Sequence, residues 1–266
     1  MGQCKGLEFL RMSDDILTLP PPPADARLPY GTDRNQFGDL RLPKASGPFP
    51  VVMNIHGGFW RAHYDLAHAG HLCAALTAKG LATWNLEYRR VGNEGGGWPG
   101  TFEDIGRGYR FLPQIAKKYS LDPDRTLVMG HSAGGQLALC LAAHEPHVKR
   151  VLSLAGVVDL QRAWDQHLSN DAVVEFLGGT PKDVPEHYRD ADPMELSIKG
   201  ATQWLIHGLG DDIVPPDFSH NYAEQKKKRG EDVHLLEISR AGHFDLIDPR
   251  SLAWPKVEQT VLHLLA

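Results

Sequence analysis

Apolar runs of strand length alternate with helical segments through most of the chain. The runs lie at 51–55, 81–86, 126–129, 151–154, 202–206 and 233–238. Strands that are apolar at nearly every position are typical of a parallel sheet buried on both faces. Two further runs, 27–30 and 37–42, flank a Gly-Thr-Asp turn and predict an antiparallel hairpin at the sheet edge. The pattern therefore predicts an α/β fold with a mostly parallel central sheet and helices on both faces.

Residue types at the helix ends and in the irregular regions refine this organisation. Thr101 with Asp104 predicts a capping box at the start of one crossover helix. Four consecutive prolines at 20–23 predict a stiff joint, and the mixed Trp, Gly, Pro and charged residues at about 157–198 predict a cap over the carboxyl edge of the sheet. We expect an N-terminal arm over residues 1–24 and one domain over residues 25–266.

Charge and composition narrow the classes of partner. The 266-residue chain has a formal net charge of −5 and no large Lys and Arg cluster that could neutralise a row of phosphates, so nucleic acid is not expected as a partner. The longest basic run, at 226–229, ends a predicted helix that begins at Asp217, and we expect the run to face water.

Cysteines and apolar stretches bear on compartment and on metal binding. Cys4, Cys73 and Cys140 are odd in number and widely spaced, which argues against disulfides and against a metal site. The first thirty residues hold no signal-like apolar stretch, and no later stretch approaches the length of a membrane span. We therefore expect a cytoplasmic protein without a membrane partner.

A serine lies between a predicted strand and a predicted helix. The strand at 126–129 leads directly into Gly-His-Ser-Ala-Gly-Gly at 130–135, which is a G-x-S-x-G motif. Its glycines permit a sharp turn that exposes the hydroxyl, and the helix N-terminus that follows favours negative charge. We predict that Ser132 is a nucleophile; the alternative is an ordinary Gly-rich turn.

A second glycine motif follows the strand at 51–55, at the same edge of the sheet. The segment is His-Gly-Gly-Phe-Trp at 56–60, and adjacent glycines let backbone N–H groups approach a substrate closely. An N–H group that binds an oxyanion lowers the barrier by about 3 kcal/mol. We predict that an oxyanion hole is formed by Gly57, Gly58, Phe59 and Ala133, the residue after the serine. His56 is expected to hold the loop, and a plain tight turn is the alternative.

Both motifs are typical of the α/β-hydrolase fold, in which nucleophile, acid and base follow in that order along the chain. The acid is expected after the strand at 202–206, where Asp211 and Asp212 compete. Asp211 lies four residues before Pro215, the usual position in D-x-x-V-P loops of this fold, and we predict that it is the acid. His243 follows the last strand, and we predict that it is the general base oriented by Asp211.

Together these motifs resemble the kynurenine formamidase (arylformamidase) branch of the α/β-hydrolases, which lies near the H-G-G carboxylesterases and lipases. The resemblance runs from about Tyr30 to the C-terminus. It implies hydrolysis of a small-acyl amide or ester through an acyl-enzyme intermediate, without cofactor or metal. The family's H-G-G-Y-W motif has Phe59 here, which leaves the substrate open.

Aromatic residues near the predicted strand ends are candidates for substrate contacts. Trp60 and Trp98 are predicted to line an aromatic cleft for a flat, apolar leaving group. The alternative is that these side chains pack the cap onto the sheet.

Other functions are compatible with the same motifs. A broad-specificity carboxylesterase is the first alternative, and a peptidase of the prolyl-oligopeptidase type is disfavoured because no propeller-sized region precedes the domain. A non-catalytic small-ligand receptor of the same fold is the alternative from another class. The expected partner is a small-molecule ester or amide, and the oligomeric state, a homodimer included, stays open.

Overall fold

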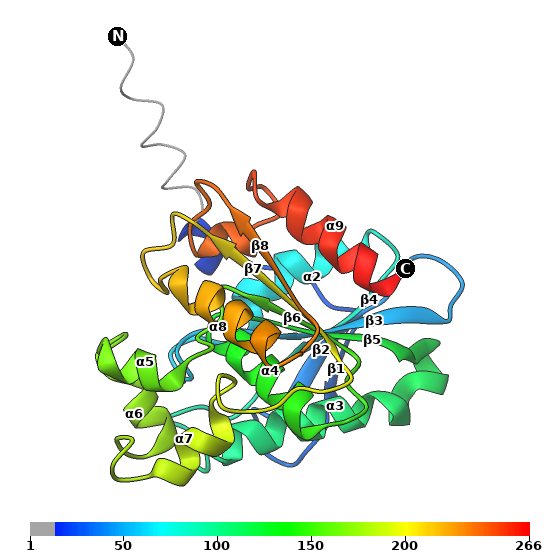
Figure 1. Ribbon diagram of the computed structural model, residues 1–266. Coiled ribbons are helices and arrows are strands. Elements are labelled where there is room, and N and C mark those ends of the chain that lie inside the picture. The colour runs from blue at the N-terminus through cyan, green and yellow to red at the C-terminus, as the bar shows by residue number, and fades with distance from the viewer. Residues whose placement is uncertain (1–13) are drawn as a thin grey trace.

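A single eight-stranded sheet forms the centre of the computed structural model, which describes residues 14–266 (Figure 1). The strands are β1 (Ala26–Pro29), β2 (Phe37–Arg41), β3 (Phe49–Ile55), β4 (Ala82–Leu86), β5 (Leu121–His131), β6 (Arg150–Leu154), β7 (Thr202–Gly208) and β8 (Val233–Ile238). Their order across the sheet is β1-β2-β4-β3-β5-β6-β7-β8. β2 pairs antiparallel with β1 and with β4, and the other neighbouring pairs are parallel. The predicted mostly parallel sheet with an edge hairpin is confirmed.

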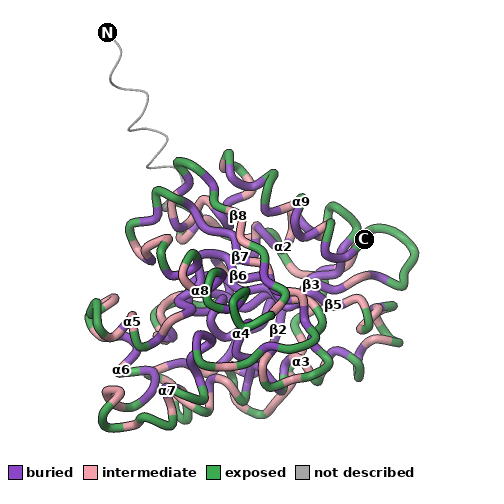
Figure 2. Tube along the Cα trace, viewed as in Figure 1, coloured by how far each residue is buried: buried purple, intermediate pink, exposed green. Residues whose placement is uncertain are grey.

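Helices cover both faces of this sheet. One face carries α2 (Gly70–Thr77) and α9 (Trp254–Leu265), and the other carries α3 (Gly100–Tyr119), α4 (Ala133–His144) and α8 (Asp217–Lys228), as Figure 1 shows. Apolar side chains fill the space between each helix layer and the sheet, so the strands form the buried centre in Figure 2. Because the strands are covered on both sides, their apolar runs are continuous rather than alternating.

Three short helices lie between β6 and β7, in the region where the cap is expected. They are α5 (Leu160–Asp165), α6 (Ala172–Leu177) and α7 (Pro185–Ala191), grouped at the lower left of Figure 1. Arg61, in the loop after β3, forms an ion pair of 2.8 Å with Glu175 of α6 and donates a hydrogen bond to the carbonyl of Ser169. This segment, residues 157–198, is therefore tied to the loops that follow the central strands.

The segment before the prolines packs against the sheet domain where the structure describes it. The 3₁₀ helix η1 (Asp14–Leu17) contacts η2 (Leu66–Ala69), and Ile16 is only 1% exposed. Residues 1–13, which include Cys4, lie outside the described residues. Within the described part of the chain, no helix combines the length and apolar character that a bilayer crossing requires.

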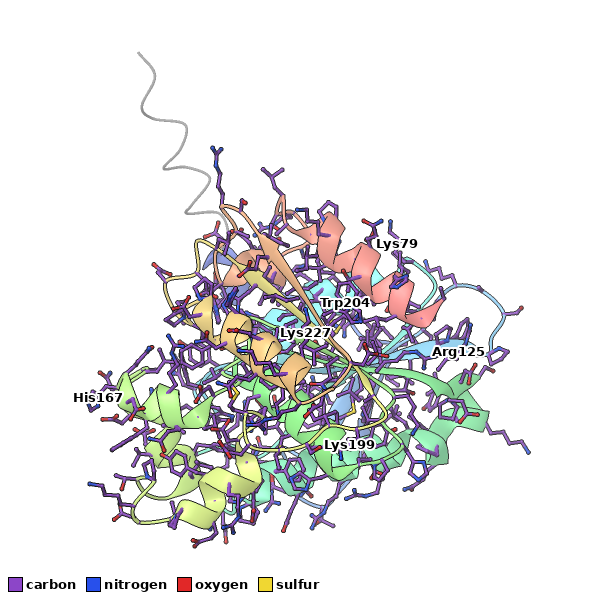
Figure 3. All side chains as sticks on the ribbon, viewed as in Figure 1. Lys79, Arg125, His167, Lys199, Trp204 and Lys227 are labelled. Carbon is purple, nitrogen blue, oxygen red and sulfur yellow. The ribbon has the colours of Figure 1, made fainter. Side chains whose placement is uncertain are left out.

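The prediction that the basic run 226–229 faces water is wrong for Lys226. Its side chain is 0% exposed, donates to the carbonyl of Leu196 and lies 3.7 Å from the Glu231 carboxylate. Lys227, at the surface of α8, is exposed as expected (Figure 3). Lys226 faces the protein because helix residues four positions apart share a face, and Tyr222 of the same helix is buried.

The predicted capping box at Thr101 and Asp104 is also wrong, although the helix is present. Thr101 is the second residue of α3, where its hydroxyl donates to the carbonyl of Arg89 and accepts from the N–H of Gly97. The Asp104 carboxylate accepts hydrogen bonds from the Arg89 guanidinium and from the Gln36 amide. Tertiary partners have replaced the local cap.

Candidate active site

Ser132 occupies a tight turn between β5 and α4. Its backbone has φ 57° and ψ −122°, a positive φ that non-glycine residues rarely adopt. A Cβ at Gly130 would collide with the carbonyl of Gly134, and a Cβ at Gly134 would collide with the carbonyl of Ile55. The glycines of the motif are therefore required by close backbone contacts, and together they hold Ser132 at the carboxyl edge of the sheet.

The loop after β3 lies against this turn. A Cβ added at Gly57 would lie 3.0 Å from Ser132 Cβ, so the two backbones approach as closely as a glycine allows. Gly58, Phe59 and Trp60 follow with φ values of 114°, 49° and 57°, three consecutive residues in the left-handed region. Such strained backbone persists only where the surrounding structure enforces it, and it occurs often at functional sites.

A buried polar network supports this loop, and His56 is part of it. His56 Nε2 lies 3.2 Å from Glu87 Oε1, and its ring stacks on Tyr88, whose hydroxyl donates to the His56 carbonyl. Burial alone would raise the pKa of Glu87, but His56 and Arg90, at 2.9 Å, outweigh it and hold this pKa below its ordinary value. The arrangement agrees with a loop-holding role for His56.

Asp211 and His243 meet across the loops that follow β7 and β8. His243 Nδ1 lies 2.7 Å from Asp211 Oδ2, and the N–H groups of Ile213 and Val214 each donate to Asp211 Oδ1 at 2.9 Å. Burial raises the pKa of Asp211, but hydrogen bonds from His207, His243 and Val214 more than compensate and lower it well below the ordinary value. Asp212 is exposed. The structure thus places Asp211, and not Asp212, against the histidine.

Two histidines that the sequence argument did not single out support this pair. His207 Nε2 lies 3.3 Å from Asp211 Oδ2, while its Nδ1 lies 2.7 Å from the Ser219 hydroxyl. His131 donates from Nε2 to the carbonyl of His243 at 3.1 Å. Burial and the neighbouring His243 hold the pKa of His131 well below its ordinary value, so its ring is neutral. Their positions directly before Ser132 and four residues before Asp211 are the only signals the sequence offers.

Ser132 and His243 line the same small cavity, of about 80 Å³. Its other lining residues are Leu17, Gly58, Phe59, Tyr64, His68, His131, Ile213 and Phe244. Two larger hollows, of about 380 and 370 Å³, are lined by residues 198–202 with 230–232 and by Trp204 with parts of β8 and α9. Neither contains Ser132, Asp211 or His243, so the small cavity is the candidate active site.

Trp60 and Trp98, predicted as substrate contacts, do not line this cavity. Trp60 is 1% exposed, stacks on Phe176 of α6 with ring centroids 4.6 Å apart, and donates to the Gln136 side chain. Trp98 also contacts Phe176, edge to face with ring centroids 6.2 Å apart, and stacks on Phe102. Both tryptophans therefore pack against residues 157–198 through Phe176.

Metal-binding geometry is not found among residues 14–266, where no group of three His, Cys, Asp or Glu side chains is arranged to hold an ion. Cys73 and Cys140 are buried free thiols. Burial raises the pKa of the Cys73 thiol to about 12 and that of Cys140 well above its ordinary value, so both resist ionisation.

Comparison with known families agrees with this architecture. The BD-FAE family model matches residues 39–225, which include the loop after β3, the Ser132 turn and Asp211. The chain belongs to the BD-FAE family. The match ends before His243, so the predicted base lies outside the matched region.

Similar proteins of known structure share the α/β-hydrolase fold with this BD-FAE family member. A carbohydrate esterase from gut microbiota superposes with a TM-score of 0.78 at 20% identity, covering 91% of this chain and 98% of the other. The propionate-bound esterase Est2 of Thermogutta terrifontis superposes with a TM-score of 0.74 at 22% identity, covering 91% and 94%.

A curated relative is similar over most of this chain. The probable isoprenylcysteine alpha-carbonyl methylesterase ICMEL1 of Arabidopsis thaliana is 25% identical over 243 residues, which is 82% of this chain and 50% of the relative. The chain spans about half the length of the first curated relatives it matches.

Proposed function

We propose that this chain is a serine hydrolase that cleaves small-acyl esters, and as a finer hypothesis small-acyl amides, through an acyl-enzyme intermediate on Ser132. The observation that carries the proposal is the 2.7 Å contact between His243 and the ionised Asp211 beside a cavity that also contains Ser132. The esterase names of the similar proteins support the choice of ester over amide.

The reaction begins with attack of Ser132 Oγ on the carbonyl carbon of the substrate. His243 accepts the hydroxyl proton, while Asp211 holds the Nδ1 proton and stabilises the imidazolium that forms. The same histidine then protonates the leaving alcohol or amine, which departs with the electron pair of the broken bond. In the second half of the reaction, water attacks the acyl carbon while His243 accepts its proton. The bond between that carbon and Ser132 Oγ then breaks, the acid leaves, and His243 returns the proton to Ser132 Oγ.

Backbone N–H groups stabilise the negative oxygen of the tetrahedral intermediate. Ala133 is the first residue of α4, where backbone N–H groups lack partners within the helix. Gly58 and Phe59, in the loop after β3, line the cavity that contains Ser132. Gly57 allows this loop to approach the Ser132 turn closely. These groups form the proposed oxyanion hole, because preorganised donors are worth most where charge develops away from water.

The first test measures kcat/KM for nitrophenyl acetate, butyrate and octanoate beside N-formylkynurenine, with Ser132→Ala as the blank. Ester turnover that is lost in the variant supports the esterase, and a formamide preference of several decades would support the arylformamidase hypothesis instead. A receptor of the same fold would neither turn over these compounds nor be labelled at Ser132 by a fluorophosphonate, and that result would refute the proposal.

A further inference from the structure

Leu17 belongs to the active-site cavity although the sequence places it in a separate N-terminal arm. It lies at the end of η1, before the proline run, and lines the same cavity as Ser132 and His243. The side chain is partly buried and packs against the apolar cluster that also contacts Phe244. The arm thus supplies one wall of the site.

The turn that carries Leu17 is anchored on its N-terminal side by a buried neighbour. Ile16 belongs to the core cluster that contains Leu246 and Ile247 of the loop after β8. The N–H groups of Thr18 and Leu19 both donate to the Asp15 carbonyl at 3.0 Å and close the turn. Leu17 is therefore held in place by core packing and local hydrogen bonds.

The chain after Leu17 is also fixed to the domain. A Cβ at Gly70 would collide with Pro21, which shows how closely the proline segment lies on the start of α2. Arg41 donates to the Pro22 carbonyl at 2.7 Å, and the Asp25 carboxylate accepts from the N–H of Leu42 at 2.7 Å. These contacts hold the proline segment along the domain, so the position of Leu17 is defined from both sides.

The cavity beside Ser132 is small and largely apolar. Leu17, Phe59, Ile213 and Phe244 contribute apolar side chains to its wall. Its volume, about 80 Å³, is about a fifth of the volume of each of the two larger hollows, of about 380 and 370 Å³. Because the cavity is small, the size of the Leu17 side chain affects a large part of the space beside Ser132.

The acyl group is the part of the substrate that must stay in such a cavity. It remains bonded to Ser132 Oγ until water replaces it, whereas the alcohol leaves after protonation by His243. We propose that Leu17 is a specificity-determining residue that limits the length of the acyl chain. This inference rests on the proposed esterase function and deepens it by naming a residue that sets the preference for acyl-chain length.

The test compares the wild type with Leu17→Ala and Leu17→Trp on nitrophenyl acetate, butyrate and octanoate, where only the acyl chain varies. We expect Leu17→Ala to raise the octanoate-to-acetate ratio of kcat/KM by about tenfold, the effect of roughly one methylene in an apolar pocket. Leu17→Trp should lower the butyrate-to-acetate ratio. If the two variants shift the acyl-chain ratios of kcat/KM in opposite directions, the effect comes from the size of the side chain at position 17 and not from a general loosening of the site. Leu252→Ala is the matched control because Leu252 is 88% exposed.

Three outcomes overturn the assignment. Unchanged acyl ratios in both variants, with Ser132 still labelled by a fluorophosphonate, would refute the role of Leu17 and leave the proposed function intact. If the variants instead change the preference among acetate esters of different alcohols, and leave the acyl series unchanged, Leu17 contacts the leaving group and not the acyl chain. An unlabelled, inactive wild type would refute the proposed function itself, and this inference with it.

Discussion

His131 Nε2 lies 3.1 Å from the backbone carbonyl of His243, so the residue directly before the proposed nucleophile holds the loop that carries the proposed base. Because a carbonyl only accepts, His131 must carry its proton on Nε2, which leaves Nδ1 without a hydrogen. The rings of the two histidines lie 4.5 Å apart. One hydrogen bond, which requires the Nε2–H tautomer of His131, thereby links the Ser132 turn to the His243 loop.

Loss of this bond should slow the chemical step. We expect His131→Phe to lower kcat about fivefold with little change in KM, since a hydrogen bond is worth about 1 kcal/mol and the loop that positions His243 becomes less constrained. Steady-state kinetics on nitrophenyl acetate measure both constants. His144→Phe is the control, because exposed His144 makes a similar bond to the Asp190 carbonyl away from the cavity. A rise in KM alone would contradict the positioning role.

Replacement of the proposed acid should separate the two adjacent aspartates. We expect Asp211→Asn to lower kcat by about 10⁴-fold while the protein stays folded, because an amide cannot fix the histidine tautomer as a carboxylate does. Asp212→Asn should leave turnover near wild type, since Asp212 is exposed. Circular dichroism checks the fold of both variants. The reverse order of effects would mean that Asp212 is the acid.

Buried neutral histidines should make the protein sensitive to mild acid. Burial lowers the pKa of His68 to about 3, whereas a histidine in the unfolded chain titrates near 6.5. Between these values the unfolded chain binds a proton that the folded protein does not, so stability falls as pH falls below about 6.5. His131, whose pKa is also lowered, acts in the same direction, and Asp192, whose pKa burial raises to about 7, acts in the opposite one.

The contribution of His68 can be isolated by difference. Urea unfolding of the wild type and His68→Asn at pH 7, 6, 5 and 4 should give slopes that differ by about 1.4 kcal/mol per pH unit below pH 6.5, the value for one proton. Exposed His147 provides the control, and His147→Asn should keep the wild-type slope. Parallel curves for His68→Asn and the wild type would show that His68 takes up its proton in the folded state.

The aromatic contacts of Phe176 should be structural. Phe176 lies stacked on Trp60 and edge to face with Trp98, and it is buried. Phe176→Ala is expected to lower the free energy of unfolding by about 3–5 kcal/mol, as for other buried aromatic truncations, with the acyl preference unchanged. Chemical denaturation and the nitrophenyl series measure the two effects. A change in acyl preference without loss of stability would instead favour a substrate contact.

Lys226 and Glu231 should act as a coupled buried pair. Lys226→Met leaves the Glu231 carboxylate buried at 2% side-chain exposure without this cation, which should destabilise the fold by about 3–5 kcal/mol. The double variant Lys226→Met with Glu231→Gln should recover a large part of that loss. Lys227→Met is the surface control and should be close to neutral. An additive double variant in denaturant unfolding would argue against coupling.

Motifs made of consecutive residues could be predicted because one short segment contains both the reactive side chain and the residues that position it. The Ser132 turn needs a strand, two glycines that avoid backbone collisions and a helix, and all of these lie within β5 and the start of α4. The apolar runs likewise predicted the parallel sheet, since strands that are covered on both faces have no solvent-facing side with polar residues. The loop after β3 was predictable for the same reason.

Residues with partners far away in the chain were decided by the tertiary structure alone. Trp60 pairs with Phe176 of the cap, and Leu17 lines a cavity that is built by the loops after β3, β5, β7 and β8. Lys226 had the pattern of a solvated helix end, but its partner Leu196 lies outside the helix. Contacts of this kind leave no periodic pattern and no fixed residue spacing in the sequence from which they could be predicted.

The sequence by itself determined the fold class and the candidate nucleophile, because burial periodicity and glycine geometry act over a few neighbouring residues. It also predicted Asp211, in preference to Asp212, as the acid and His243 as the base. Only the tertiary structure decided that Asp211 faces His243, that the two tryptophans pack against the cap and that Leu17 lines the cavity. These relationships depend on which loops meet at the carboxyl edge of the sheet, and that is set by the packing of the whole domain.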